Sequence, residues 1–206
     1  MMTTDDRRGA RRATYASAIS AAIVMFARRR VALGFVCGGL VLWLAEPTAT
    51  TLVAGTSIAT LGECLRVWAS GHLNKAREVT VSGPYRWCAH PLYVGSSVIG
   101  IGLAVASNSV AVSGVIVLYL AVTLTAAIRN EEAFLRRRFG DRYDRYRRGR
   151  LGTDAGVVAD ARRHFSLMQA TANREHRALV GLAVAVLLLV LKATYNGSFW
   201  RAAGPR

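Results

Sequence analysis

The sequence predicts an all-α fold, a polytopic membrane helix bundle with about five transmembrane helices. Apolar residues make up 52% of the 206 residues, and they fall in long blocks with almost all of the charges between them. A helix that crosses hydrocarbon needs roughly 20 mostly apolar residues, because its backbone groups must find their hydrogen bonds within the segment. The alternation of basic connections between the blocks also predicts how the helices cross the membrane.

Five apolar blocks predict the spans, which we expect over about 31–45, 48–69, 92–107, 109–128 and 178–195. Residues 1–30 are then a basic cytoplasmic tail or an interfacial helix, ahead of a membrane domain over 31–206. Glu63 and Arg66 lie near the end of the second span. Because they are three residues apart, they share a helix face and can pair. Such groups either face a cavity or form a structural pair at the membrane boundary.

The basic residues predict the orientation. Of the 27 Lys and Arg residues, 24 lie in the N-terminal tail, at or around the 70–92 connection, or in 129–177. The predicted spans place these three regions on one side. Cytoplasmic connections of membrane proteins carry such an excess of positive charge. We therefore expect the N-terminus and both long segments in the cytoplasm, and the C-terminus outside.

The formal net charge of +15 indicates an anionic partner, either nucleic acid or the inner face of a membrane. No compact basic module and no nucleic-acid recognition motif occurs in the sequence. We therefore expect membrane lipids and no nucleic acid as partners. Each Lys or Arg near an anionic surface gains about 1 kcal/mol. The three cysteines lack metal-ligand spacing and predict no metal site.

The stretch GPYRWCAHPLY, residues 83–93, predicts a non-helical elbow over 83–91 at the cytoplasmic surface, leading into the third span. Its Gly-Pro pair marks a turn, and each proline pushes the preceding residue out of helical geometry. Irregular backbone at this depth survives where it is buried in protein or lines a cavity. Taken alone, Tyr85, Trp87 and Tyr93 are typical of an interfacial aromatic belt, and His90 is typical of a packing histidine.

The segment after the fourth span supplies carboxylates. Glu131 and Glu132 follow that span directly, and 130–147 has the spacing of an amphipathic helix along the inner face. Taken alone, Glu132 and Arg136 are an ordinary i,i+4 pair on a solvated face. Placed against the elbow, the two glutamates complete a pocket with aromatic faces and a nearby arginine. Such a pocket suits an amphoteric, aromatic and cationic ligand.

Together the two segments resemble a known family. GPYRWCAHPLYVG, followed after a helical hairpin by NEEAFLRRRFGDRYDRY, is similar to the isoprenylcysteine carboxyl methyltransferase family. The pattern of that family is G-x-Y, then R-H-P-x-Y-x-G, then E-E-x-x-L-x-x-x-F-G-x-x-Y-x-x-Y. The preceding LRVWASGHLNK looks like bacterial members, and the resemblance covers about residues 60–147. It implies an integral methyltransferase of the bacterial inner membrane, with S-adenosylmethionine in a cytoplasmic pocket and a lipophilic or lipid-linked substrate.

The resemblance also implies the site residues. Arg129 and Glu132 are the implied catalytic residues, with Arg129 holding a substrate carboxylate. An ionised carboxylate acceptor needs no general base, so catalysis would rest on alignment, exclusion of water and compensation of charge. The cofactor-binding positions carried over from the family's motifs are Arg77, Val79, Thr80, Tyr85, His90, Pro91, Leu92, Tyr93 and Glu131.

Two departures from the family pattern leave the acceptor open. Ala89 stands where the family has an arginine, and RRGRLGTDAG replaces a proline-containing stretch after the second tyrosine. A carboxylate acceptor, giving a methyl ester, is the first expectation. One alternative is phospholipid or amine N-methylation, in which Glu132 or His90 would remove a proton. Another is a non-catalytic membrane scaffold that keeps the family motifs.

Overall fold

The computed structural model describes residues 32, 34–74, 78–148 and 164–199, and every regular element in these ranges is helical. The predicted all-α fold is confirmed for this part of the chain, while the predicted N-terminal tail lies outside the described residues. The elements are Gly34–Leu44, α2 (Ala49–His72), the 3-10 helix η1 (Gly83–Arg86), α3 (Pro91–Ser107), α4 (Val110–Phe139), α5 (Asp141–Arg147), α7 (Leu167–Ala172) and α8 (His176–Tyr195).

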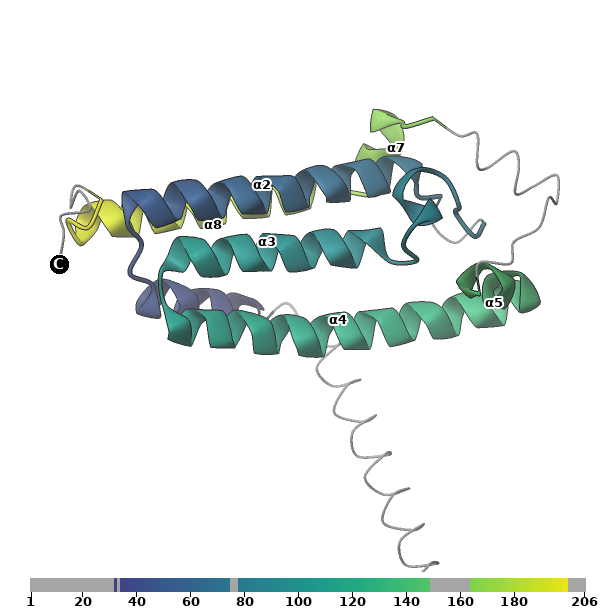
Figure 1. The fold of residues 1–206 in the computed structure, drawn as a ribbon, viewed down its shortest axis with the longest axis horizontal. Helices are drawn as coiled ribbons and strands as arrows, with labels where there is room; N and C mark the ends of the chain where they lie inside the picture. Colours follow the sequence, from purple (N-terminus) through teal and green to yellow (C-terminus); the bar gives the residue numbers. More distant parts are fainter. Residues whose placement is uncertain (1–31, 33, 75–77, 149–163, 200–206) are drawn as a thin grey trace, which may run out of the picture.

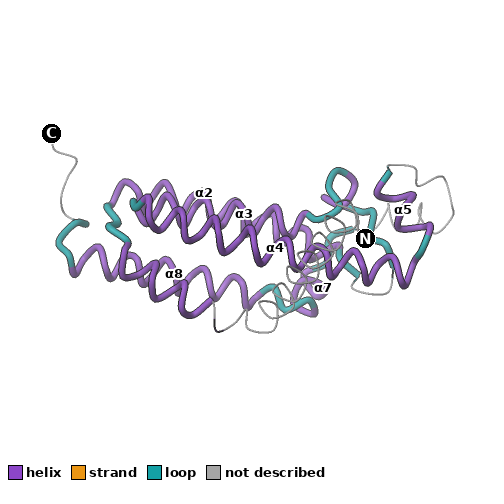
Figure 2. Tube along the Cα trace, turned by 90° about the horizontal axis from the view of Figure 1, so that it is seen from below, coloured by secondary structure: helices purple, strands orange, loops and turns teal. Residues whose placement is uncertain are grey.

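Four long helices form the bundle. α2 and α3 run antiparallel side by side, α4 lies along α3, and α8 lies along α2 (Figure 1). Figure 2 shows α5 and α7 at one end of the bundle, with the end of α8 at the other. The elbow between α2 and α3 lies at the same end as α5 and α7. The described parts of the two long connections, 70–92 and 129–177, therefore lie at the same end of the bundle, as the alternating topology predicts.

Length and composition qualify two helices as membrane spans. α4 has 30 residues and α8 has 20, and both are apolar enough to cross a bilayer. At 1.5 Å per residue, α8 measures about 30 Å, the thickness of a hydrocarbon core. α3 and Gly34–Leu44 are apolar but shorter, and α2 carries Glu63, Arg66 and His72. A helical membrane protein fits these lengths, and the five spans stay a prediction.

α2 and α3 touch through their backbones. A Cβ added at Gly62 would lie 2.7 Å from the nitrogen of Ile99 and 2.8 Å from the oxygen of Gly95. One added at Gly102 would lie 2.8 Å from the Cα of Ala59. Small residues permit such close approach, and van der Waals packing drives helix association where no water is displaced. The glycines of α2 and α3 therefore serve close helix packing.

Arg66 joins three elements. Its Nε lies 2.7 Å from Glu175 Oε1, directly before α8, and 3.6 Å from Glu63 Oε2 on α2. Its Nη1 donates a hydrogen bond to the hydroxyl of Ser96 on α3. Both glutamates are buried. The predicted pair of Glu63 and Arg66 is confirmed, and Glu175 is a partner that the sequence did not indicate.

α7 closes the C-terminal end of α2. The amide of Asn173 donates to the carbonyl oxygens of Ser70 at 2.9 Å and Leu73 at 2.8 Å, and the amide of Gln169 donates to Leu73 at 3.0 Å. The last carbonyls of a helix have no intrahelical partner. These side chains supply the missing donors at a buried helix end, so α7 is held against α2.

The opposite end of the bundle is tied by its short connections. The backbone nitrogen of Glu46 donates to the carbonyl oxygen of Ser107 at 2.8 Å, and the Asn108 amide donates back to the Glu46 carbonyl at 3.2 Å. The Ser198 hydroxyl, after α8, donates to the Pro47 carbonyl at 2.7 Å. The connection before α2, the α3–α4 turn and the end of α8 therefore meet.

The single amphipathic helix predicted over 130–147 is wrong. α4 continues to Phe139, and Gly140 ends it with a φ of +48°. A left-handed φ favours glycine, which commonly terminates helices in this way. α5 then starts in a new direction, and the hydroxyl of Tyr146 donates to the carbonyl oxygen of Tyr85 in the elbow at 2.8 Å. The break therefore places α5 against the elbow.

Replacing Gly62 with alanine is expected to lower the free energy of unfolding by about 1–3 kcal/mol, the usual cost of overpacking. Gly114→Ala on α4 is the matched control, because nothing lies within 4 Å of its added carbon. Alanine's helix propensity should make that control neutral or stabilising by up to about 1 kcal/mol. Unfolding by SDS in mixed micelles measures both. A Gly62→Ala variant as stable as wild type would contradict the backbone contact.

Arg66→Met removes the cation that Glu63 and Glu175 share. The free energy of unfolding should fall by about 3–5 kcal/mol, because two buried carboxylates lose their partner. Arg137→Met on the exposed face of α4 should change it by no more than about 0.5 kcal/mol. The same SDS titration compares them, and equal, small losses would show that the buried cluster contributes little.

Candidate functional site

The elbow is built over a buried histidine. Gly83 has a φ of +55°, in the left-handed region that favours glycine. A Cβ at this position would lie 2.7 Å from Cγ of His72, so the chain passes directly over that ring. The Nδ1 of His72 lies 3.0 Å from the carbonyl oxygen of Trp68. The predicted non-helical elbow over 83–91 is therefore partly helical, since it begins with the 3-10 helix η1.

A cavity of about 350 Å³, here the elbow cavity, lies between the elbow, the stretch just after α2, α4 and α5. This volume is within the range of small-molecule and cofactor sites. Aromatic rings and two carboxylates dominate its wall. The lining residues are Leu73, Asn74, Glu78, Val79, Thr80, Tyr85, Ala89, Tyr93, Glu131, Phe134, Leu135, Tyr143 and Tyr146.

Two phenols of this wall are held neutral. Burial raises the pKa of Tyr85 above its ordinary value, and the neighbouring Glu131 raises it further. Burial likewise raises the pKa of Tyr143. The hydroxyl of Tyr143 is buried and has no hydrogen-bond partner among the described residues. An unpaired buried donor is costly, and a ligand acceptor in the cavity would satisfy it.

The two adjacent glutamates have different surroundings. Glu131 lines the elbow cavity, and its Oε2 lies 3.8 Å from Nδ1 of His90. Glu132 does not line it, and its carboxylate lies 3.4 Å from Nε2 of His90 and 3.9 Å from Nη2 of Arg136. It also accepts a hydrogen bond from Nη1 of Arg147 on α5. Glu132 therefore connects α4 with α5 and the elbow, whereas Glu131 faces the cavity.

The predicted cofactor-binding residues gather at this cavity. Five of them line it: Val79, Thr80, Tyr85, Tyr93 and Glu131. Three others lie behind the wall: the His90 ring centroid is 5.6 Å from that of Tyr93, Leu92 packs against Tyr85, and Pro91 is the buried first residue of α3. Arg77 lies outside the described residues.

The two predicted catalytic residues do not join the wall. Arg129 is exposed on α4 and is not a lining residue, and Glu132 is engaged in ion pairs. Ala89, where the family has an arginine, lines the cavity. Among the lining residues that the structure describes, Glu78 and Glu131 are therefore the charged ones, and both are acidic. The roles of Arg129 and Glu132 stay predictions.

Sequence reasoning missed part of this wall. Asn74 lies in the stretch LRVWASGHLNK but was not among the predicted site residues, yet its amide donates to Glu78 Oε1 at 2.9 Å, and its backbone nitrogen donates to the hydroxyl of Thr80 at 3.3 Å. Tyr143 belongs to the second motif, but an unbroken helix would have carried it along the membrane surface. Gly140 before an acidic residue was the available signal for a helix end.

The groups of the wall fit S-adenosylmethionine. This ligand combines a sulfonium cation, an aromatic base and hydroxyl groups. Carboxylates compensate its charge and accept its hydrogen bonds, and aromatic faces attract a cation or stack on a base. The unpaired hydroxyl of Tyr143 is a further available donor. Within the described ranges, no group of three or more His, Cys, Asp or Glu side chains is arranged to hold a metal ion.

Comparison with known proteins places residues 30–142, more than half of the chain, in the phospholipid methyltransferase family. The chain is 32% identical over 108 residues to the nickel-cobalt-cadmium resistance protein NccN of Alcaligenes xylosoxydans xylosoxydans, covering 52% of this chain and 49% of that protein. It is 36% identical over 95 residues to the cobalt-zinc-cadmium resistance protein CzcN of Cupriavidus metallidurans, covering 45% and 43%. The match spans about half the length of these curated relatives. No solved structure matches the chain.

Tyr143→Phe is expected to leave the thermal unfolding midpoint of the ligand-free protein unchanged or slightly raised, because its hydroxyl has no partner among the described residues. Tyr146→Phe is the matched variant, since it removes the 2.8 Å hydrogen bond to the Tyr85 carbonyl. It should cost about 1 kcal/mol. Circular dichroism on heating measures the unfolding midpoint of both variants. A larger drop of the midpoint for Tyr143→Phe than for Tyr146→Phe would contradict an unpaired hydroxyl.

Proposed function

This chain belongs to the phospholipid methyltransferase family, and we propose that it transfers a methyl group from S-adenosylmethionine to a lipophilic acceptor in the membrane. Family membership implies a membrane methyltransferase, and the family generally uses this cofactor. One observation carries the proposal: five predicted cofactor-binding residues, from three separate stretches of the chain, line the same cavity. We place this site on the cytoplasmic face of a bacterial inner membrane, following the distribution of basic residues.

The elbow cavity would hold the cofactor through charge and aromatic contacts. When bound, the cofactor supplies a methyl group on a positively charged sulfur. Glu131 would accept hydrogen bonds from the amino group or the hydroxyls of the cofactor. The face of Tyr85 or Tyr93 would contact the sulfonium of the cofactor. The neutral Tyr143 hydroxyl donates to a ligand acceptor. The elbow and α5 exclude water, so that the remaining barrier depends on alignment of donor and acceptor.

The charges of the wall favour an amine acceptor over the carboxylate expected from the sequence. A carboxylate requires a cation beside it, and the charged lining residues in the described part of the chain are Glu78 and Glu131. An ammonium group must lose a proton before it can accept a methyl group. His90, which lies behind the wall at 3.8 Å from Glu131 and 3.4 Å from Glu132, is our candidate base, and the two carboxylates would compensate the charge that it gains.

Calorimetric titration of S-adenosylmethionine and S-adenosylhomocysteine into the protein in lipid discs tests the cofactor site. Wild type should bind both. Glu131→Gln should weaken binding at least about tenfold, since hydrogen bonds to a charged group contribute about 1.5–3 kcal/mol. Glu46→Gln, exposed at the opposite end of the bundle, should bind like wild type. A folded wild type that binds neither compound would favour the scaffold alternative.

The same preparation identifies the acceptor class when the cofactor carries a labelled methyl group and bacterial lipids are added. A methyl ester releases labelled methanol in mild alkali, whereas an N-methyl group keeps its label. We expect alkali-stable product, and His90→Ala should lower its rate of formation by a larger factor than it weakens cofactor binding. Alkali-labile product would restore the carboxylate acceptor.

A further inference from the structure

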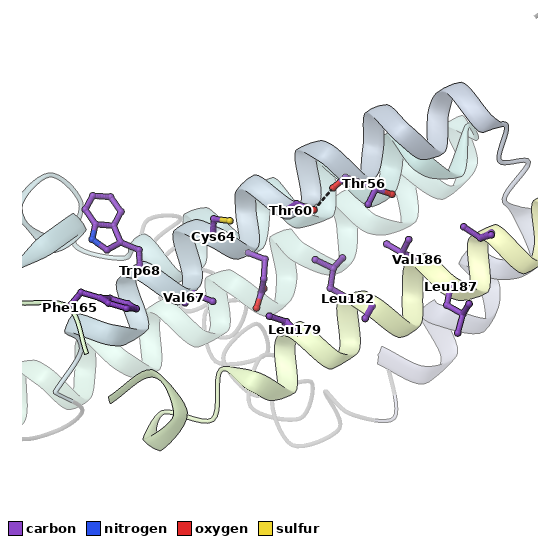
Figure 3. A pocket seen from close by; sticks show the side chains of 13 residues that line it. Thr56, Thr60, Cys64, Val67, Trp68, Phe165, Leu179, Leu182, Val186 and Leu187 are labelled. Carbon is purple, nitrogen blue, oxygen red and sulfur yellow. Dashed lines mark hydrogen bonds between the residues drawn. The ribbon is translucent and has the colours of Figure 1, made fainter. Parts of the chain in front are cut away.

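A second cavity, of about 840 Å³, lies between α2 and α8, and we call it the α2–α8 groove. Figure 3 shows Val67 and Thr60 of α2 facing Leu179, Leu182 and Val186 of α8, with Trp68 and Phe165 together at one end. α8 lies outside residues 30–142, which match the family. One wall of this groove is therefore built by a segment beyond the family match.

The groove wall is mostly apolar, and Glu63 is the charged residue among its described lining residues. Glu63 lines the groove with only 5% of its surface exposed. No hydrogen bond reaches either of its carboxylate oxygens from the residues that the structure describes. Its ion pair with Arg66 is long, 3.6 Å, while Arg66 lies 2.7 Å from Glu175. Two acids therefore share one cation, and the less well compensated acid faces the groove.

The other polar and aromatic groups that line the groove are compatible with a positively charged ligand beside Glu63. The hydroxyl of Thr60 donates to the Thr56 carbonyl at 2.8 Å, which leaves its oxygen as an acceptor (Figure 3). The rings of Trp68 and Phe165 present aromatic faces, which attract cations. A buried carboxylate without hydrogen bonds is costly at membrane depth. A ligand that relieves this cost must donate a hydrogen bond and carry positive charge.

We propose that the α2–α8 groove binds a lipophilic amine, whose protonated nitrogen donates to Glu63 and whose hydrocarbon chain lies between α2 and α8. Charge complementarity selects the amine, and the apolar wall selects the chain. The site does not depend on methyl transfer, because the groove and the elbow cavity share no lining residue. The two cavities are nevertheless neighbours along the chain. Trp68 in the groove and Leu73 in the elbow cavity lie five residues apart, a separation of about 7.5 Å at the rise of a helix.

Carbodiimide labelling of wild type in lipid vesicles tests the site. Dicyclohexylcarbodiimide is apolar and modifies carboxyl groups that it reaches from the lipid phase, and peptide mass spectrometry locates the adduct. We expect Glu63 to be labelled. Glu46, exposed at the end of the bundle, should instead react with a water-soluble carbodiimide. Failure of the apolar reagent to label Glu63 would overturn the proposal, because the carboxylate would then be closed to the groove.

Protection identifies the ligand class. N,N-dimethyldodecylamine is the probe, since a tertiary amine cannot form an amide with the activated carboxyl group. At ten times its Kd it should slow labelling of Glu63 about tenfold by mass action, whereas dodecanol at the same concentration should not. Equal protection by the alcohol would overturn the assignment of a cationic head group, and no protection by the amine would overturn the site.

A matched pair of variants tests the position of the chain. Val186→Trp fills the groove, whereas Val184→Trp places the same ring at an exposed position that does not line it. Val186→Trp should abolish protection by the amine, and Val184→Trp should retain it. Thermal unfolding and S-adenosylhomocysteine binding report whether each variant is folded. Loss of protection in both variants, with both folded, would place the amine elsewhere.

Discussion

One half-buried guanidinium constrains the arrangement of the bundle. Arg66 lies between Glu63 and Glu175 and donates to Ser96, so α2, α3 and the start of α8 meet at a single charge. An ionisable group at membrane depth is tolerated when protein groups pair with it. α7 belongs to the same arrangement, because Asn173, two residues before Glu175, satisfies the last carbonyls of α2. The position of the elbow follows from where α2 ends.

The elbow cavity depends on two opposite uses of glycine. Between α2 and α3, glycines remove side chains so that two backbones touch and behave as one rigid wall. At Gly140 the left-handed backbone breaks a helix, so that α5 turns against the elbow. Ion pairs from Glu132 and the hydrogen bond from Tyr146 then hold α5 in place. The α2–α3 pair carries the elbow at its end, and the elbow, α4 and the attached short helix α5 enclose the space in which Glu131 and the tyrosines lie.

Composition and charge were enough to predict a helical membrane protein, because hydropathy and the side of each basic connection are properties of short segments. The motifs predicted most of the cofactor wall because they, too, are short segments of the chain. They assigned the cofactor to Glu131 and catalysis to Glu132, but they did not predict that Glu132 points away from the cavity into ion pairs, because the rotation of α4 about its axis decides this. Nor did they predict Glu175 as a partner of Arg66, since the two residues are 109 positions apart. Such a pairing depends on how the whole bundle closes.

That separation also has a consequence for biosynthesis. At about 5–20 residues per second, the ribosome needs about 5–20 s to reach Glu175 after it has added Arg66. During that interval α2 carries a cation whose closest partner has not yet been synthesised. Glu63, three residues upstream, is already present and serves as the provisional counter-charge. When α8 arrives, Glu175 takes the closer position beside the guanidinium, and the first acid remains in the wall of the groove.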